Sequence, residues 1–83
     1  MSEEFFNRII TDVIFLVNEE FKKLRLKKIT RDDVELFFLE DVIGIQINLD
    51  IKQSKKVVLN QRFVKISMEI QELHSIPGFR VVC

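Results

Sequence analysis

The apolar side chains of this chain are almost all large, which limits the folds that can enclose them. Hydrophobic residues make up 47% of the 83 residues, yet the sequence contains no alanine, tryptophan or tyrosine. A domain of this size buries only about 60–65% of its unfolded surface. We therefore expect a single domain over residues 1–83 that carries more large apolar surface than its own core encloses.

A long amphipathic helix is predicted from residue 3 to about residue 26. Ser2 is a suitable N-cap, and Glu3 and Glu4 follow where the helix dipole favours negative charge. The apolar side chains of this helix fill an arc of about 180°, whereas packing against one layer needs about 100°. We expect the unburied part to bind protein, and the candidate residues are Phe5, Phe6, Ile9, Phe15 and Phe21.

The middle of the chain is predicted to form strands. Apolar and polar residues alternate from Ile43 to Ile51, a period typical of a strand with one buried face. Residues 33–39 are ambiguous, because Thr30 and Asp33 could open a short helix as a capping box. We favour a strand, since the segment is rich in β-branched and aromatic residues and a short hairpin connection follows it.

Residues 57–70 are compatible with a helix or with a strand. Alternation from Val64 to Ile70 is typical of a strand, but apolar residues also recur at helical spacing: Leu59, Phe63, Ile66, Ile70 and Leu73. Ile76-Pro77-Gly78 is a stop signal, because Pro lacks an amide hydrogen and Gly tolerates left-handed geometry. We predict a helix from about residue 57 or 60 to 75, after a polar connection at 52–56. A final strand is predicted at 79–82.

These elements place the chain in the α+β class, as a single small domain with the order α-β-β-α-β. A helix between the second and third strands requires a right-handed crossover and a parallel pairing. We therefore expect a three-stranded mixed sheet with both helices on one face, and with the polar residues of the middle strand on the other.

The order of elements and the ending from Ile76 to Val82 resemble several small modules. These are BON domains, ring-building domains of secretion systems, C-terminal iron–sulphur scaffold domains and some KH-like folds. The GxxG loop of KH RNA binding is missing, and so is the cysteine pair of the iron–sulphur scaffold. What the resemblance implies is a small domain that acts by docking to protein.

A basic cluster provides a second candidate surface, formed by Lys22, Lys23, Arg25, Lys27 and Lys28. Such a cluster can bind phosphates, which would make it a nucleic-acid-binding site. Compensation of the helix dipole is the simpler explanation, because the net charge is zero and acidic pairs follow at Asp32-Asp33 and Glu40-Asp41. These acidic pairs fit caps and turns better than a metal site.

No pattern typical of an enzyme is found in the sequence. His74 has no catalytic partner at a recognisable spacing, and the single Cys83 cannot form an internal disulfide. Phosphate loops, dinucleotide fingerprints and CxxC pairs are absent, so we expect no catalytic residue, cofactor, metal or small-molecule substrate. An acidic N-terminus and the lack of an apolar run of roughly 20 residues predict a cytoplasmic protein without a membrane partner.

We therefore predict a non-enzymatic protein-interaction or regulatory domain. It would act as a homo-oligomer or bound to a protein partner, through the first helix, an exposed sheet edge or both. The alternative is a nucleic-acid-binding protein that uses the basic cluster at residues 22–28.

Overall fold

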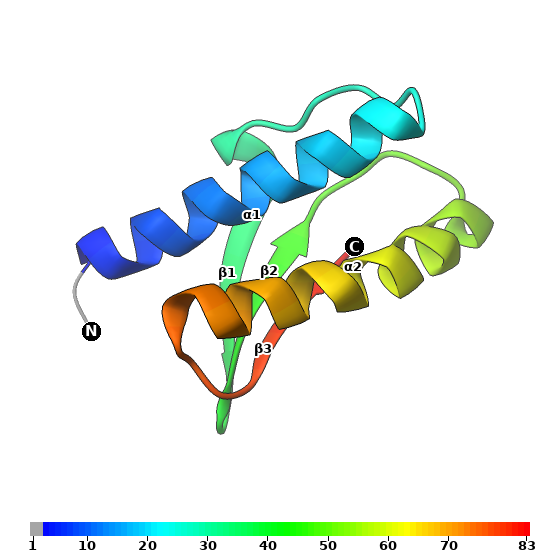
Figure 1. Cartoon of the computed structure of the whole chain (residues 1–83). Helices are drawn as coiled ribbons and strands as arrows, with labels where there is room; N and C mark the ends of the chain where they lie inside the picture. The colour runs from blue at the N-terminus through cyan, green and yellow to red at the C-terminus, as the bar shows by residue number, and fades with distance from the viewer. Residues whose placement is uncertain (1–2) are drawn as a thin grey trace.

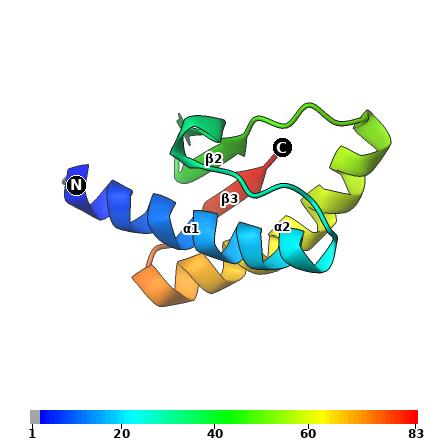
Figure 2. The ribbon, with the colours of Figure 1, turned by 90° about the horizontal axis from the view of Figure 1, so that it is seen from above.

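Two helices cover one face of a three-stranded sheet, as Figure 1 and the view from above in Figure 2 show. The computed structural model describes residues 3–83, so the predicted N-cap Ser2 lies outside the described residues. In chain order the elements are α1 (Glu3–Lys23), the 3-10 turn η1 (Arg31–Asp33), β1 (Val34–Leu39), β2 (Val42–Ile47), α2 (Gln53–His74) and β3 (Phe79–Val82). The predicted α+β class, the order of elements and the position of both helices are confirmed.

β2 is the central strand of the sheet. It pairs antiparallel with β1, with Val34 opposite Ile47, and parallel with β3, with Ile43 opposite Phe79. The crossover from β2 to β3 is α2, as a parallel pairing requires. The predicted mixed sheet is therefore confirmed.

The core lies between the helices and the sheet face that they cover. Its buried side chains come from both helices and all three strands. They include Ile9, Ile10, Val13, Val17 and Phe21 of α1, Leu59, Phe63, Ile66 and Ile70 of α2, and Val34, Ile45, Ile47, Phe79 and Val81 of the sheet. In the described chain, residues 3–83, neither helix combines the length and apolar content that crossing a membrane needs.

The first helix ends at Lys23, three residues before the predicted end. Arg25 takes the left-handed conformation with φ 58°, and the Leu26 N–H donates to the Phe21 carbonyl at 2.8 Å. This is the usual way to end a helix, but the left-handed residue is most often glycine. Because an arginine occupies that position, the sequence contains no signal for the end of α1.

The second helix begins at Gln53, so the prediction of a polar connection at 52–56 is wrong. The N–H groups of Lys55 and Lys56 both donate to the Lys52 carbonyl, at 3.0 and 3.1 Å. The first turn of α2 is thus helical although its side chains are polar and mostly exposed. The middle strand correspondingly ends at Ile47 rather than at residue 51.

The ambiguity before β1 is resolved by a short turn followed by a strand. The Asp33 carboxylate accepts a hydrogen bond from the Thr30 N–H at 2.8 Å, which forms a capping box around η1. Only one turn forms, and the chain becomes extended at Val34. The strand predicted for residues 34–39 is confirmed.

Candidate protein-interaction surfaces

Of the five candidate protein-binding residues on α1, Phe15 alone is largely exposed, at 62%. Ile9 and Phe21 belong to the core, with 2% and 1% exposure. Phe5 and Phe6 are half-buried, and Phe5 packs against the core. The expected unburied apolar surface on this helix is therefore limited to its outer face at Phe15.

The wide apolar arc of α1 is largely buried because the helix has neighbours on three sides. One side packs on the sheet. A second side faces α2, where Asp12 Oδ2 lies 2.7 Å from His74 Nε2. On the third side the chain after α1 folds back, and the Asn18 amide donates to and accepts from the Ile29 backbone at 3.0 and 2.8 Å. A helix packed on three sides needs more than the single stripe of a surface helix.

Large apolar side chains are exposed elsewhere, mainly on α2 and β1. We define the α2 stripe as Val57, Val64 and Met68, which are between 50% and 61% exposed. Their spacing places them on the side of α2 that faces away from the core. On β1, Phe38 is 64% exposed, and its ring packs edge-on against that of Phe6 with centroids 5.7 Å apart.

The free edge of β3 is hydrogen-bonded by side chains of α2. Ser67, which is buried, accepts a hydrogen bond at Oγ from the Val81 N–H at 3.0 Å. Asn60 accepts one from the Cys83 N–H at 2.8 Å and donates one to the Cys83 carbonyl at 3.4 Å. The side chains therefore take the place of a neighbouring strand.

Gln71 extends this arrangement to the start of β3. Its side-chain oxygen accepts from the Gly78 N–H at 3.2 Å, and its nitrogen donates to the Phe79 carbonyl at 3.4 Å. We refer to Asn60, Ser67 and Gln71 as the α2 ladder. Their spacing of seven and four residues puts them on one face of the helix, beside its apolar face. That polar row among apolar residues was visible in the sequence, but its partner strand was not.

The free edge of β1 is different. The Asn48 N–H donates to the Asp33 carbonyl at 2.8 Å, and this sets the alternation of the antiparallel pairing. Because backbone groups alternate in direction along a strand, the N–H and C=O of Leu36 and Phe38 point away from β2. Within residues 3–83, the hydrogen bond at this edge is the one that the Arg31 guanidinium donates to the Val34 carbonyl, at 3.0 Å.

The β1 edge is also strongly acidic. Between residues 31 and 41 the sequence has one basic residue, Arg31, and five acidic ones: Asp32, Asp33, Glu35, Glu40 and Asp41. Asp33 is occupied in the capping box, and the other four carboxylates are on exposed residues. The open edge is thus an apolar strand flanked by negative charge.

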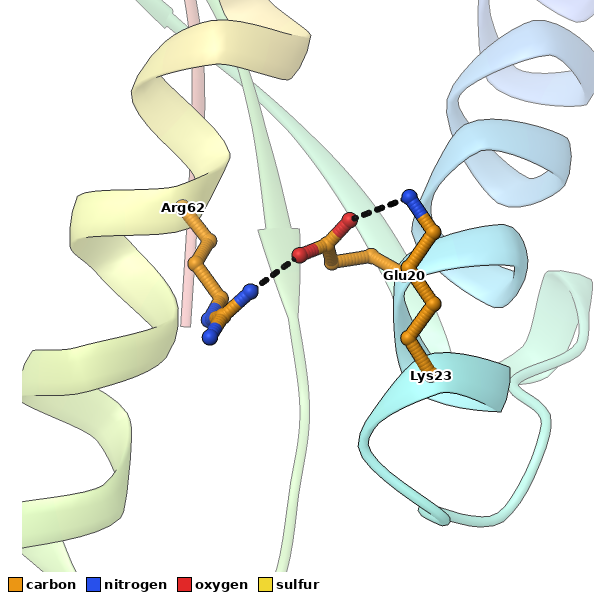
Figure 3. A network of polar contacts seen from close by, with 3 residues as sticks. All are labelled: Glu20, Lys23 and Arg62. Atoms are coloured by element: carbon orange, nitrogen blue, oxygen red, sulfur yellow. Dashed lines mark hydrogen bonds and ion pairs between the residues drawn. The ribbon is translucent and has the colours of Figure 1, made fainter.

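The basic cluster gathers at the end of α1 and in the chain that follows it, and all five residues are exposed. Carboxylates lie close to it. Figure 3 shows Glu20 between Arg62 and Lys23, with the Lys23 ammonium 3.8 Å from the carboxylate. Asp33 and Asp50 line the same hollow as Lys27 and Lys28. These neighbours reduce the positive potential that a phosphate would meet.

Titratable side chains form no metal-binding group of three or more within the part of the chain that the structure describes. Burial raises the pKa of the Cys83 thiol, and the nearby Lys56 ammonium opposes this only in part. A raised pKa leaves less of the reactive thiolate at neutral pH. In comparisons with known proteins, no family model, curated protein or solved structure matches this chain.

Proposed function

We propose that this chain is a non-enzymatic protein-interaction domain that adds an extended segment of a partner protein to the free edge of β1. The supporting observation is the difference between the two sheet edges. Side chains of α2 hydrogen-bond several backbone groups along the edge of β3, whereas within residues 3–83 nothing hydrogen-bonds the outward N–H and C=O groups of Leu36 and Phe38. Backbone pairing at such an edge supplies affinity, and alternate side chains supply specificity.

The surroundings of β1 define the chemistry of the partner segment. On the side of the helices, its side chains would lie beside Phe38 and Phe6, which favours large apolar residues. At its ends it would meet the exposed carboxylates of Asp32, Glu40 and Asp41. An extended segment with alternating apolar and basic residues fits both features.

A second copy of the same strand fits this edge poorly. Pairing β1 with β1 would bring two acidic segments together, each with five carboxylates and one guanidinium. Like charges directly opposite each other destabilise a strand pair. Charged flanks of this kind commonly prevent edge-to-edge self-association.

A titration with two synthetic peptides tests the proposal. One peptide alternates Lys with Val, the other alternates Glu with Val, and binding is followed by fluorescence anisotropy and by amide NMR shifts. We expect the Lys peptide alone to bind and the largest shifts to occur at Leu36 and Phe38. Binding of both peptides alike, or shifts centred on residues 22–28, would contradict the proposal.

Leu36→Pro supplies a variant that removes an N–H group of the edge, together with a leucine side chain that packs partly against the core. Proline removes one N–H, and at Leu36 that group points away from β2, so the pairing within the sheet is retained. We expect this variant to keep its fold by circular dichroism and to lose peptide binding. Phe15→Asp, on the outer face of α1, is the matched control and should bind as the natural sequence does.

Nucleic-acid binding through the basic cluster is an outcome that the same assay distinguishes. A single-stranded oligonucleotide would then bind with an affinity that falls steeply with salt. Replacement of Lys22, Lys23 and Lys27 by Glu would abolish that binding and leave peptide binding intact.

A further inference from the structure

The backbone groups that β1 turns away from β2 belong to Val34, Leu36 and Phe38. Arg31 occupies both groups of Val34. Its guanidinium donates to the Val34 carbonyl at 3.0 Å, and its own carbonyl accepts a hydrogen bond from the Val34 N–H. Within residues 3–83, nothing hydrogen-bonds the outward groups of Leu36 and Phe38. The edge is therefore closed at Val34 and open at the other two residues.

The exposure of the side chains changes along the edge in the same sense. Phe38 is 64% exposed, Leu36 is half-buried, and Val34 is only 4% exposed. β1 ends at Leu39, and the turn at residues 40 and 41 leads directly into β2. The open edge is thus a short window, bounded by Arg31 before it and by the hairpin turn after it.

The guanidinium of Arg31 stands where a further residue of an added strand would bond. In a strand ladder, the outward carbonyl of Val34 would accept a hydrogen bond from an N–H of the partner. Arg31 Nη1 fills that position from within the same chain. Arg31 forms no ion pair within residues 3–83, so the Val34 carbonyl is the group that holds it in place.

We infer, on the basis of the proposed function, that Arg31 is a specificity-determining residue that limits the partner segment to the positions opposite Leu36 and Phe38. The partner side chains at these positions lie on the helix side of the sheet, beside Phe38 and Phe6. A further apolar residue of the partner would come level with Val34 and find its carbonyl occupied. The recognised motif is accordingly a pair of apolar residues separated by one residue, rather than a longer alternating run.

Arg31 also fixes the register of the partner. A shift of the partner by two residues toward Val34 is blocked by the guanidinium. A shift by one residue would turn the apolar side chains to the other face of the sheet. The same hydrogen bond therefore sets both the length and the position of the paired segment.

Two peptides of equal charge test this role. In the first, three valines alternate with lysine. In the second, glycine replaces one terminal valine, the last for an antiparallel partner and the first for a parallel one. For the natural sequence we expect dissociation constants equal within about twofold, because the third valine finds no backbone acceptor. For Arg31→Ala we expect the three-valine peptide to bind about tenfold more tightly than the other, since a hydrogen bond and a cross-strand pair are gained.

The ratio of the two dissociation constants separates this effect from charge. Loss of the positive charge of Arg31 strengthens both lysine peptides alike and leaves their ratio unchanged. Asp32→Ala is the matched control, since it changes an exposed neighbour in the same turn and should give the ratio of the natural sequence. Arg31→Ala should keep its fold by circular dichroism, because the capping box of η1 joins Thr30 and Asp33.

Intermolecular NOEs provide a second readout. Contacts between the third valine and Val34 are expected in the complex of Arg31→Ala and not in that of the natural sequence. A tenfold ratio already in the natural sequence, or a ratio that Arg31→Ala leaves unchanged, would overturn the role of Arg31 and leave the proposed function standing. If neither peptide bound the natural sequence, both would be overturned.

Discussion

Gly44 of β2 lies on the uncovered face of the sheet at a point where a side chain has no room. It lies opposite Phe37 of β1, and a Cβ added to it would be 2.0 Å from Phe37 Cζ. The phenyl ring therefore lies over the glycine, on the face that no helix covers. This accounts for a glycine in the centre of a strand, where it is otherwise unfavourable by about 0.5–1 kcal/mol relative to alanine.

We predict that Gly44→Ala lowers the free energy of unfolding by about 1–3 kcal/mol, because the new methyl group displaces the Phe37 ring. Urea denaturation measures the change. In a Phe37→Ala background the same substitution should be neutral or stabilising, since alanine suits a strand better than glycine. An equal loss in both backgrounds would show that the ring is not the cause.

Cys83 provides a prediction about pH. Because burial raises the pKa of its thiol in the folded chain, the neutral thiol is favoured by folding. The resulting stabilisation is present at pH values below the pKa of the unfolded chain and is lost as the pH rises through the higher folded value. We expect Cys83→Ser to remove this part of the alkaline decline in stability, as measured by urea unfolding at a series of pH values.

Alkylation of Cys83 gives a second measurement of the same shift. Iodoacetamide reacts with the thiolate, so at mildly alkaline pH the folded chain should react more slowly than the chain in urea. Equal rates, after correction for the reactivity of a model thiol in urea, would contradict the raised pKa.

At the scale of elements, α2 performs two tasks with two of its faces. One face fills the core with Leu59, Phe63 and Ile70, and the α2 ladder beside it bonds the backbone of β3. A helix at this position can satisfy an edge strand only if polar side chains of suitable length recur at helical spacing. The alternation that made residues 57–70 ambiguous in sequence has another origin: Val64 and Met68 are exposed, while Ile66 and Ile70 belong to the core face.

We predict that Ser67→Ala lowers the free energy of unfolding by about 1–3 kcal/mol, because it leaves the buried Val81 N–H without an acceptor. Amide hydrogen exchange at Val81 should accelerate more than at Ile45, which pairs within the sheet. Ser54→Ala, in the exposed first turn of α2, is the matched control and should change stability by less than about 0.5 kcal/mol. If Ser67→Ala and Ser54→Ala lowered the free energy of unfolding equally, or if exchange accelerated equally at Val81 and Ile45, the hydroxyl would not be a specific partner of β3.

The strands and the end of α2 were predictable, whereas the end of α1 was not. Alternation and β-branched composition identified β1 and β2, because both patterns follow from local geometry. Both helices end at a non-glycine residue in the left-handed conformation, Arg25 and Ser75. Pro77 and Gly78 revealed the second end, whereas the first had no such marker.

At the scale of the whole molecule, the excess of large apolar side chains was correctly expected and wrongly located. Neighbours on three sides bury most of the apolar arc of α1, whereas Val57, Val64 and Met68 of α2 are exposed. Which helix is surrounded depends on how the chain after α1 folds back, and the contact between Asn18 and Ile29 that holds this segment joins residues from two different segments of the chain. Periodicity within a single segment contains no information about such neighbours.

The α2 ladder has a consequence for how large an assembly of this chain can become. A sheet with two available edges can keep adding strands at both sides and grow into a fibre. Here side chains end the growth at β3, so a partner strand can join at one side only. Each chain is accordingly expected to take up one partner segment, always beside β1, because the hydrogen bonds from α2 occupy the edge of β3.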